Sequence, residues 1–141
     1  SQQIRDGLFH KEYTAVLHGA PDTDRGTLVD LLARDKAERK TYVVTEPGKD
    51  VQEAILNYEL LAQTENFSKV RIELVTGRTH QIRCQFSSRN LPLVGDRKYS
   101  THADDCEIAL WSSLLRFRHP RTGEELTFTA PPPDEFPWNH F

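Results

Sequence analysis

The chain has 141 residues, of which 37% are hydrophobic and 28% are charged, with a formal net charge of −3 and a mean hydropathy of −0.62. This length fits one domain, and no apolar run approaches the ~18 residues of a membrane helix, which excludes an integral membrane protein. Only Cys84 and Cys106 could form disulfides, which excludes a disulfide scaffold and favours a reducing cytoplasm. The chain contains no methionine, so we expect residues 1–141 to be one piece of a longer protein.

The first third of the chain is typical of strands joined by polar loops. Residues 11–18 alternate apolar and polar side chains, which predicts a half-buried strand. Residues 19–26 are predicted to form a loop, and residues 27–32 are an apolar run of undecided type. Residues 33–40 are predicted as a polar loop or a frayed turn. Residues 40–45 are predicted as a strand, which residues 46–50 break.

The middle of the chain predicts a hairpin followed by one helix. Residues 54–63 suit either period and are interpreted as a strand, because residues 65–68 resemble a turn into the alternating strand 69–75. A loop at residues 76–78 then precedes a helix from Thr79 to about Arg89. Thr79 is expected to cap the helix, and Ile82 and Phe86, four residues apart, are expected to be buried. The helix is expected to end at Asn90 in a left-handed conformation, before Pro92.

The last third predicts a second hairpin and a packed tail. Residues 108–119 and 126–129 are β-rich and flank the turn 120–124. The tail 134–141 is expected to form a short helical turn that packs on the body through Phe136, Trp138 and Phe141. The sum of these elements is an α+β protein, with a mostly antiparallel mixed sheet and one main helix.

Charge is unevenly distributed along the chain. Between Phe67 and Ser100, seven basic residues face two acidic ones, a net charge of +5, which leaves −8 for the rest. A basic stretch on an acidic domain is a candidate footprint for a polyanion such as RNA. The alternative is an ordinary solvated surface.

The segment from Thr76 to Arg83, T-G-R-T-H-Q-I-R, concentrates the candidate chemistry. It places a glycine loop between a strand and a helix, where backbone N–H groups favour an anion. His80 and Arg83 are three residues apart and share one helix face. An arginine beside the inward-facing Ile82 is expected to be half-buried and to need a carboxylate partner.

The run from Val70 to Ser100 resembles the signature stretch of RNA pseudouridine synthases of the type named ribosomal large subunit pseudouridine synthase A. Three other pieces agree with that family in type and order: the strand that carries Tyr13, the turn Gly95-Asp96 with Tyr99, and the closing hairpin 115–124 with Ala130-Pro131. The chain departs from the family pattern at four positions, where other residues are commoner: Cys84, Gln85, Asn90 and Ser100.

The resemblance implies isomerisation of uridine in RNA to pseudouridine, without a metal or an organic cofactor. In that family an aspartate within an H-R-L-D segment, which precedes the tyrosine strand, attacks the nucleoside. The 141 residues contain no such segment. The chain is therefore expected to be the C-terminal part of the catalytic domain, incomplete at its N-terminus, and to be inactive by itself.

The resemblance also assigns site residues one by one. It gives Tyr13 the position that stacks on the target base and takes part in proton transfer, and it pairs Arg83 with the catalytic aspartate. It makes Leu74 an apolar wall of the uracil pocket. Contacts to the flipped nucleotide and its phosphates are expected from Arg78, His80 and Gln81, and nonspecific phosphate attraction from Arg97 and Lys98. Without the resemblance, Tyr13 and Leu74 would be interpreted as core and Arg83 as a surface residue.

Other residues receive structural interpretations. Asp96 is expected to fix its turn and Cys84 to fill a small buried space. Four residues resemble metal ligands only when taken together, and no metal is expected there: His102, Asp104, Asp105 and Cys106.

Two alternatives stay open, a non-catalytic RNA-binding module and a different phosphate-binding enzyme that uses the Thr76–Arg83 loop. The sequence indicates neither the uridine nor whether the RNA is ribosomal or transfer RNA. A truncated sheet predicts self-association through an exposed edge.

Overall fold

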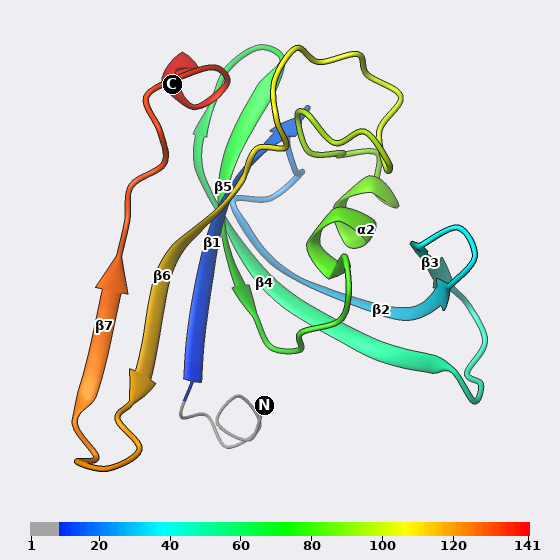
Figure 1. Ribbon diagram of the computed structural model, residues 1–141. Helices are drawn as coiled ribbons and strands as arrows, with labels where there is room; N and C mark the ends of the chain where they lie inside the picture. The colour runs from blue at the N-terminus through cyan, green and yellow to red at the C-terminus, as the bar shows by residue number, and fades with distance from the viewer. Residues whose placement is uncertain (1–8) are drawn as a thin grey trace.

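The computed structural model describes residues 9–141, which form one seven-stranded sheet with an α-helix packed on it (Figure 1). The strands lie in the order β3-β2-β4-β5-β1-β6-β7, and every neighbouring pair is antiparallel. This confirms the α+β class. The elements are β1 (Phe9–His18), β2 (Arg25–Asp35), β3 (Lys40–Val44), β4 (Val51–Gln63), β5 (Phe67–Leu74), α2 (Gln81–Ser87), β6 (Leu110–Arg118), β7 (Glu125–Thr129) and the 3-10 helix η1 (Trp138–His140).

Strand β2 corrects the prediction for the segment after the first strand. Residues 25–26 of the predicted loop, the apolar run of undecided type and the first three residues of the polar segment form one strand of 11 residues. Residues 36–39 form the turn that the polar composition predicted. The polar residues Ala33–Asp35 extend because they pair with β3, as in Ala33 opposite Tyr42. Long-range pairing therefore overrides the loop composition. The other predicted strands are confirmed, with ends shifted by at most three residues.

Helix α2 is shorter than predicted, and Thr79 does not cap it. The N-cap is His80, which has a left-handed φ of 55° and makes no side-chain cap hydrogen bond. The backbone carbonyl of Thr79 accepts a hydrogen bond from the Thr41 hydroxyl instead. The end of the helical segment follows the prediction, since Asn90 has a left-handed φ of 61°.

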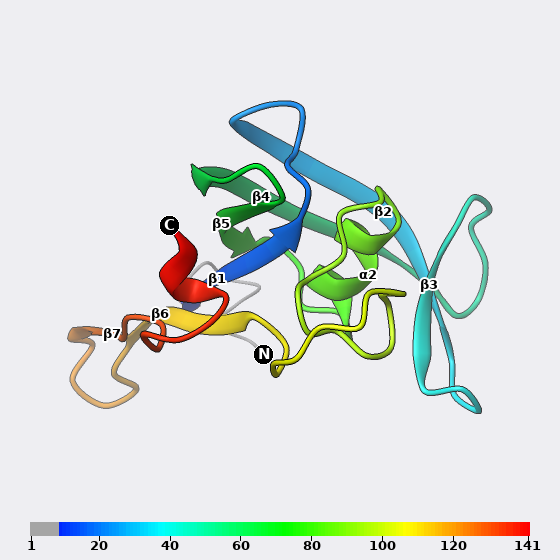
Figure 2. The same ribbon diagram turned by 90° about the horizontal axis from the view of Figure 1, so that it is seen from above.

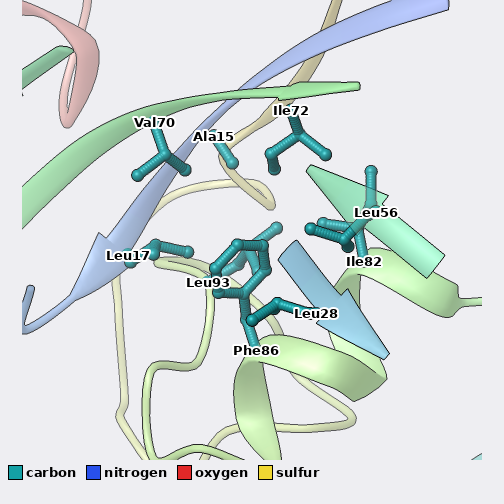
Figure 3. Packing of buried hydrophobic residues seen from close by; sticks show 9 residues of the cluster. All are labelled: Ala15, Leu17, Leu28, Leu56, Val70, Ile72, Ile82, Phe86 and Leu93. Atoms are coloured by element: carbon teal, nitrogen blue, oxygen red, sulfur yellow. The ribbon is translucent and has the colours of Figure 1, made fainter. Parts of the chain in front are cut away.

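The main core lies between α2 and the central strands (Figure 3). Ile82 and Phe86 project from the helix, as predicted, and Leu93 lies beside them. They meet six buried residues from four strands: Ala15, Leu17, Leu28, Leu56, Val70 and Ile72. The hairpin β6–β7 extends away from the helix (Figures 1 and 2), so the covered part of the sheet ends near β1.

The C-terminal tail packs on the body, and Trp138 is the aromatic residue that reaches a buried cluster. The predicted helical turn exists as η1, and Trp138 packs against the cluster of Val16, Val94 and Ala109. Phe136 and Phe141 are 36% and 37% exposed, but both contact β5: the Phe136 ring lies edge-on to Phe67 with centroids 6.0 Å apart, and the Lys69 ammonium lies 5.6 Å from the centroid of the Phe141 ring. Across residues 9–141, no helix has the length and apolar character needed to cross a membrane.

Candidate active site

A cavity of about 290 Å³ opens where α2 begins. Six of the eight site residues predicted from the sequence line it: Tyr13, Leu74, Arg78, His80, Gln81 and Arg83. The sequence did not single out its other lining residues, Ile82, Ile108 and Leu110. Ile108 and Leu110 lie two residues apart at the start of β6, and that spacing on a predicted strand was the signal available.

The central strands place Tyr13 and Leu74 on the same side of the sheet. Tyr13 alternates with Ala15 and Leu17 along β1, and both of those residues pack against the helix side. Leu74 ends β5, two residues beyond the buried Ile72, which lies opposite Tyr13. A second hollow, of about 230 Å³, shares Tyr13, Leu74 and Arg78 with the cavity, so the two spaces adjoin.

Gln81 holds the loop that forms one wall of the cavity. Its side chain is 2% exposed. The Oε1 atom accepts hydrogen bonds from the Thr76 hydroxyl and the Arg78 N–H, both at 2.9 Å, while Nε2 donates to the Ile55 carbonyl at 3.1 Å. The backbone N–H of Arg78 donates to Gln81 and is therefore not available to bind an anion.

Arg83 is held by Asp96 rather than left free. Its Nε donates to Oδ2 and its Nη2 to Oδ1, each at 2.9 Å, in a bidentate ion pair. The Arg83 side chain is 21% exposed and that of Asp96 is fully buried. The guanidinium also lies over the Tyr99 ring, 4.9 Å from its centroid. The sequence predicted that Arg83 needs a carboxylate, but not that Asp96 supplies one.

Asp96 also fixes its own turn, as predicted. Its Oδ1 accepts the N–H groups of Lys98 and Tyr99 at 2.9 and 3.0 Å. Burial raises the pKa of the Asp96 carboxyl, but the hydrogen bonds from Arg83 and from the two backbone N–H groups outweigh it, so the net pKa is lowered. The carboxylate is therefore ionised at neutral pH and keeps the guanidinium in place.

His80, which lines the cavity, and Tyr99 lie beside this ion pair. Nδ1 of His80 lies 2.9 Å from the Tyr99 hydroxyl, which also accepts the Thr41 N–H at 2.7 Å. Partial burial, and then the charge of Arg83, lower the pKa of His80. The imidazole is therefore predominantly neutral at neutral pH.

The basic residues of the Phe67–Ser100 stretch do not gather in one patch. Arg78 and Arg83 reach the cavity, whereas Arg71 lies on the other face of β5 and pairs with Glu12 and Glu59. Arg97 and Lys98 are exposed and lie outside the cavity lining. The Lys98 ammonium donates to the carbonyls of Glu38 and Arg39 in the β2–β3 turn.

Hydrogen bonds and ring stacking hold the loop that contains the mixed metal-like donors. Asp104 accepts hydrogen bonds from His18 Nε2 at 2.8 Å and from the Gly95 N–H at 2.9 Å. The His102 ring stacks on His18 with centroids 3.6 Å apart. Cys84 is 3% exposed and packs with Leu32 and Ala54, and burial raises its pKa to about 11, which matches its predicted role as a filler.

In residues 9–141, the antiparallel sheet with one α-helix packed on it has a pseudouridine synthase fold. Residues 1–88 match the family described as RNA pseudouridylate synthase. Over 135 residues the chain is 40% identical to an uncharacterized RNA pseudouridine synthase, YlyB, of Bacillus subtilis, covering 94% of this chain and 44% of that protein. The chain belongs to the RNA pseudouridylate synthase family.

Other relatives agree with this assignment. Ribosomal large subunit pseudouridine synthase D of Haemophilus influenzae is 34% identical over 141 residues, which cover 89% of this chain and 42% of that protein. The chain thus spans less than half the length of these curated relatives. The solved structure of human RNA pseudouridylate synthase domain containing 1 shares the fold, with a TM-score of 0.79 at 24% identity, over 94% of this chain and 58% of that one.

Proposed function

We propose that this chain forms one wall of the active site of an RNA pseudouridine synthase, of the type named ribosomal large subunit pseudouridine synthase A. In this proposal, residues 1–141 are the C-terminal part of the catalytic domain, and the catalytic aspartate comes from an H-R-L-D segment outside them. The observation that carries the proposal is the gathering of Tyr13, Leu74 and Arg83, with the Thr76–Arg83 loop, around one cavity.

The state of Arg83 supports a second carboxylate at this site. Asp96 occupies its Nε and Nη2 atoms, whereas Nη1 has no hydrogen-bond partner among residues 9–141. A guanidinium carries five N–H donors, so Arg83 can hold an incoming aspartate without releasing Asp96. Asp96 therefore sets the position of Arg83, and Arg83 would keep the catalytic carboxylate ionised and oriented.

The other lining groups suit a uridine. Tyr13 offers a flat ring for the base and a hydroxyl for proton transfer. Leu74 provides an apolar wall, and Arg78 provides a cation for a phosphate. In the net reaction, the bond from the sugar to N1 of uracil breaks, a bond from the sugar to C5 forms, N1 gains a proton and C5 loses one.

Because C5 loses its proton, release of tritium from RNA labelled at C5 of uridine tests the proposal. We expect no release above background from the 141-residue chain by itself. A protein that joins this chain to an H-R-L-D segment should release tritium. Release by the isolated chain would contradict the proposed division of the site, and no release by the joined protein would contradict the proposed function.

Within the joined protein, Arg83→Lys keeps the positive charge but loses the planar fork that binds two oxygens at once. We expect release to slow by about 10- to 100-fold, in keeping with the loss of one electrostatic contact in an active site. Arg118→Lys is the matched control, because Arg118 is exposed at the far end of β6.

A non-catalytic RNA-binding module is the second candidate. Such a module would share the cavity wall formed by Tyr13, Leu74 and Arg83 but would lack the catalytic aspartate. The joined protein separates the two candidates, since only the enzyme releases tritium. The third candidate, a phosphate-binding enzyme, is weakened by Gln81, whose Oε1 already occupies the Arg78 N–H.

Ribosomal or transfer RNA is the proposed partner, and a second copy of the chain is a further one. The edge strands of the sheet are β3 and β7. On β7, Phe128 is 56% exposed beside unpaired backbone groups, which is typical of an edge that self-associates.

A further inference from the structure

The hydroxyl of Tyr99 connects the site to strand β3 and determines where the His80 proton can reside. Its oxygen accepts the N–H of Thr41 at 2.7 Å, since a backbone N–H can only donate. The same oxygen lies 2.9 Å from Nδ1 of His80. The His80 ring stands edge-on to the Tyr99 ring, with an interplanar angle of 89°.

The hydrogen bonds of the Tyr99 hydroxyl indicate which ring nitrogen of His80 carries the proton. The Tyr99 hydroxyl has one proton to donate, and within residues 9–141 its only acceptor at hydrogen-bond distance is Nδ1 of His80. Nδ1 is then unprotonated, and in a neutral imidazole the proton lies on Nε2. The opposite tautomer would leave the Tyr99 O–H without an acceptor among residues 9–141.

We propose that Tyr99 is a positioning residue that holds His80 as the neutral Nε2–H tautomer, so that His80 donates a hydrogen bond to an uncharged oxygen of the nucleotide in the cavity. The identity of the nucleotide rests on the proposed function, whereas the tautomer does not. The oxygen is either a uracil carbonyl or a ribose hydroxyl, because both accept an N–H without carrying charge.

Two further observations support this role. His80 lines the cavity, and Tyr99 occupies only one of its two ring nitrogens. His80 also has a left-handed φ of 55°, a conformation that costs a residue with a Cβ about 1–2 kcal/mol. Such strain is concentrated at functional sites, where the surrounding structure imposes it.

The charges around the ring favour a neutral donor over a cationic phosphate ligand. Arg83, Arg34 and Lys98 all disfavour an imidazolium at this position, and only Asp96 favours one. A neutral donor adds no positive charge to the site, so it gains no counterion release on binding RNA. In this arrangement Arg78 and His80 have separate tasks, with the phosphate assigned to Arg78.

Nuclear magnetic resonance of the 15N-labelled 141-residue chain tests the tautomer directly. Correlations between ring carbon-bound protons and ring nitrogens should show a protonated Nε2 and an unprotonated Nδ1 for His80. His80→Asn identifies its signals, because asparagine tolerates the left-handed conformation. A protonated Nδ1 of His80 in the wild-type chain would overturn the proposal.

Tyr99→Phe removes the hydroxyl and should convert His80 to a mixture of both tautomers. Tyr42→Phe is the matched control, because the Tyr42 hydroxyl on β3 donates to Glu38 and makes no bond to the site. The control should leave the His80 signals unchanged. An unchanged tautomer in folded Tyr99→Phe would contradict a positioning role for Tyr99.

The salt dependence of oligouridylate binding tests whether the oxygen that accepts the His80 hydrogen bond is uncharged. Removing a phosphate contact to a single strand lowers the slope of log affinity against log salt by about 0.7. Arg78→Gln should show that change, whereas His80→Asn should weaken binding about threefold to tenfold with the slope unchanged. A lower slope for His80→Asn would overturn the uncharged acceptor.

Oligodeoxyuridylate identifies which oxygen accepts. If the effect of His80→Asn disappears on the deoxy strand, the acceptor is the 2′-hydroxyl, and if it persists, the acceptor is a uracil carbonyl. Failure of the wild-type chain to bind oligouridylate would overturn the nucleotide acceptor, whereas tritium release by the joined protein decides the proposed function. The tautomer measurement would still decide the part played by Tyr99.

Discussion

Two turns of this molecule each contain a glycine at positive φ, but one turn is enclosed by other parts of the chain and the other is open. Gly95, before Asp96, has a φ of +82°, and Gly123, between β6 and β7, has a φ of +70°. A Cβ on Gly95 would overlap the backbone carbonyl of Glu107, whereas one on Gly123 would meet nothing within 4 Å. The first turn is enclosed by distant parts of the chain, and the second is open.

The ion pairs beside these turns differ in the same way. Arg83 and Asp96 make two hydrogen bonds of 2.9 Å, with the aspartate fully buried. Arg116 and Glu125 approach to 3.8 Å, with side chains that are 44% and 66% exposed. Residue types alone do not separate the two turns. Burial does, and we expect it to concentrate stability at the Gly95 turn.

The largest expected effect comes from breaking the buried ion pair. Asp96→Ala should lower the free energy of unfolding by about 3–5 kcal/mol, because it leaves the Arg83 guanidinium and two backbone N–H groups without their acceptor. Glu125→Ala in the open hairpin should lower it by less than about 0.5 kcal/mol. Urea unfolding of both variants measures the difference, and equal losses would contradict the comparison.

Acid provides a second measurement on the same pair. The pKa of Asp96 is lowered in the folded protein, so its stabilising contribution is complete above the unfolded pKa, near 3.8, and is lost as the pH falls through the folded value. Asp96→Asn cannot ionise. Its stability should therefore fall less steeply than that of the wild type as the pH drops below about 4.

A prediction on the two glycines separates the cost of steric overlap from the cost of backbone strain. Gly95→Ala and Gly123→Ala both place a side chain at positive φ, which costs about 1 kcal/mol. Only Gly95→Ala also forces the Glu107 backbone to move, which raises the expected loss to about 2–4 kcal/mol. Thermal unfolding of the two variants tests this, and a loss at Gly123 as large as that at Gly95 would show that strain alone sets the cost.

Local patterns predicted the parts of the structure that local physics determines. Alternation located the strands around Tyr13 and Ile72, because burial on one face of a strand repeats every two residues. The Thr76–Arg83 segment placed most of the cavity lining, since its members are close in sequence and share one loop and one helix. Asn90 identified a left-handed position in the same way.

The sequence predictions failed where contacts between distant segments determine the structure. Strand β2 continues through polar residues only because β3 pairs with it. His80 replaces Thr79 as the helix cap while the Tyr99 hydroxyl, 19 residues away, bonds its ring. Asp96 becomes the partner of Arg83 only when the chain folds back from the helix, 13 residues later. No period or composition encodes such contacts.

The smallest expected effect belongs to the open hairpin and its edge. If β7 associates with a second copy, Phe128→Lys should weaken dimerisation by about 1 kcal/mol and leave the free energy of unfolding nearly unchanged, because an edge lysine opposes strand pairing. Val29→Lys is the control, since Val29 is 52% exposed but lies on β2, between two strands. Sedimentation at rising concentration should show less dimer for Phe128→Lys only. A wild-type chain that stays monomeric would rule out the edge as an interface and would leave Phe128 exposed for some other reason.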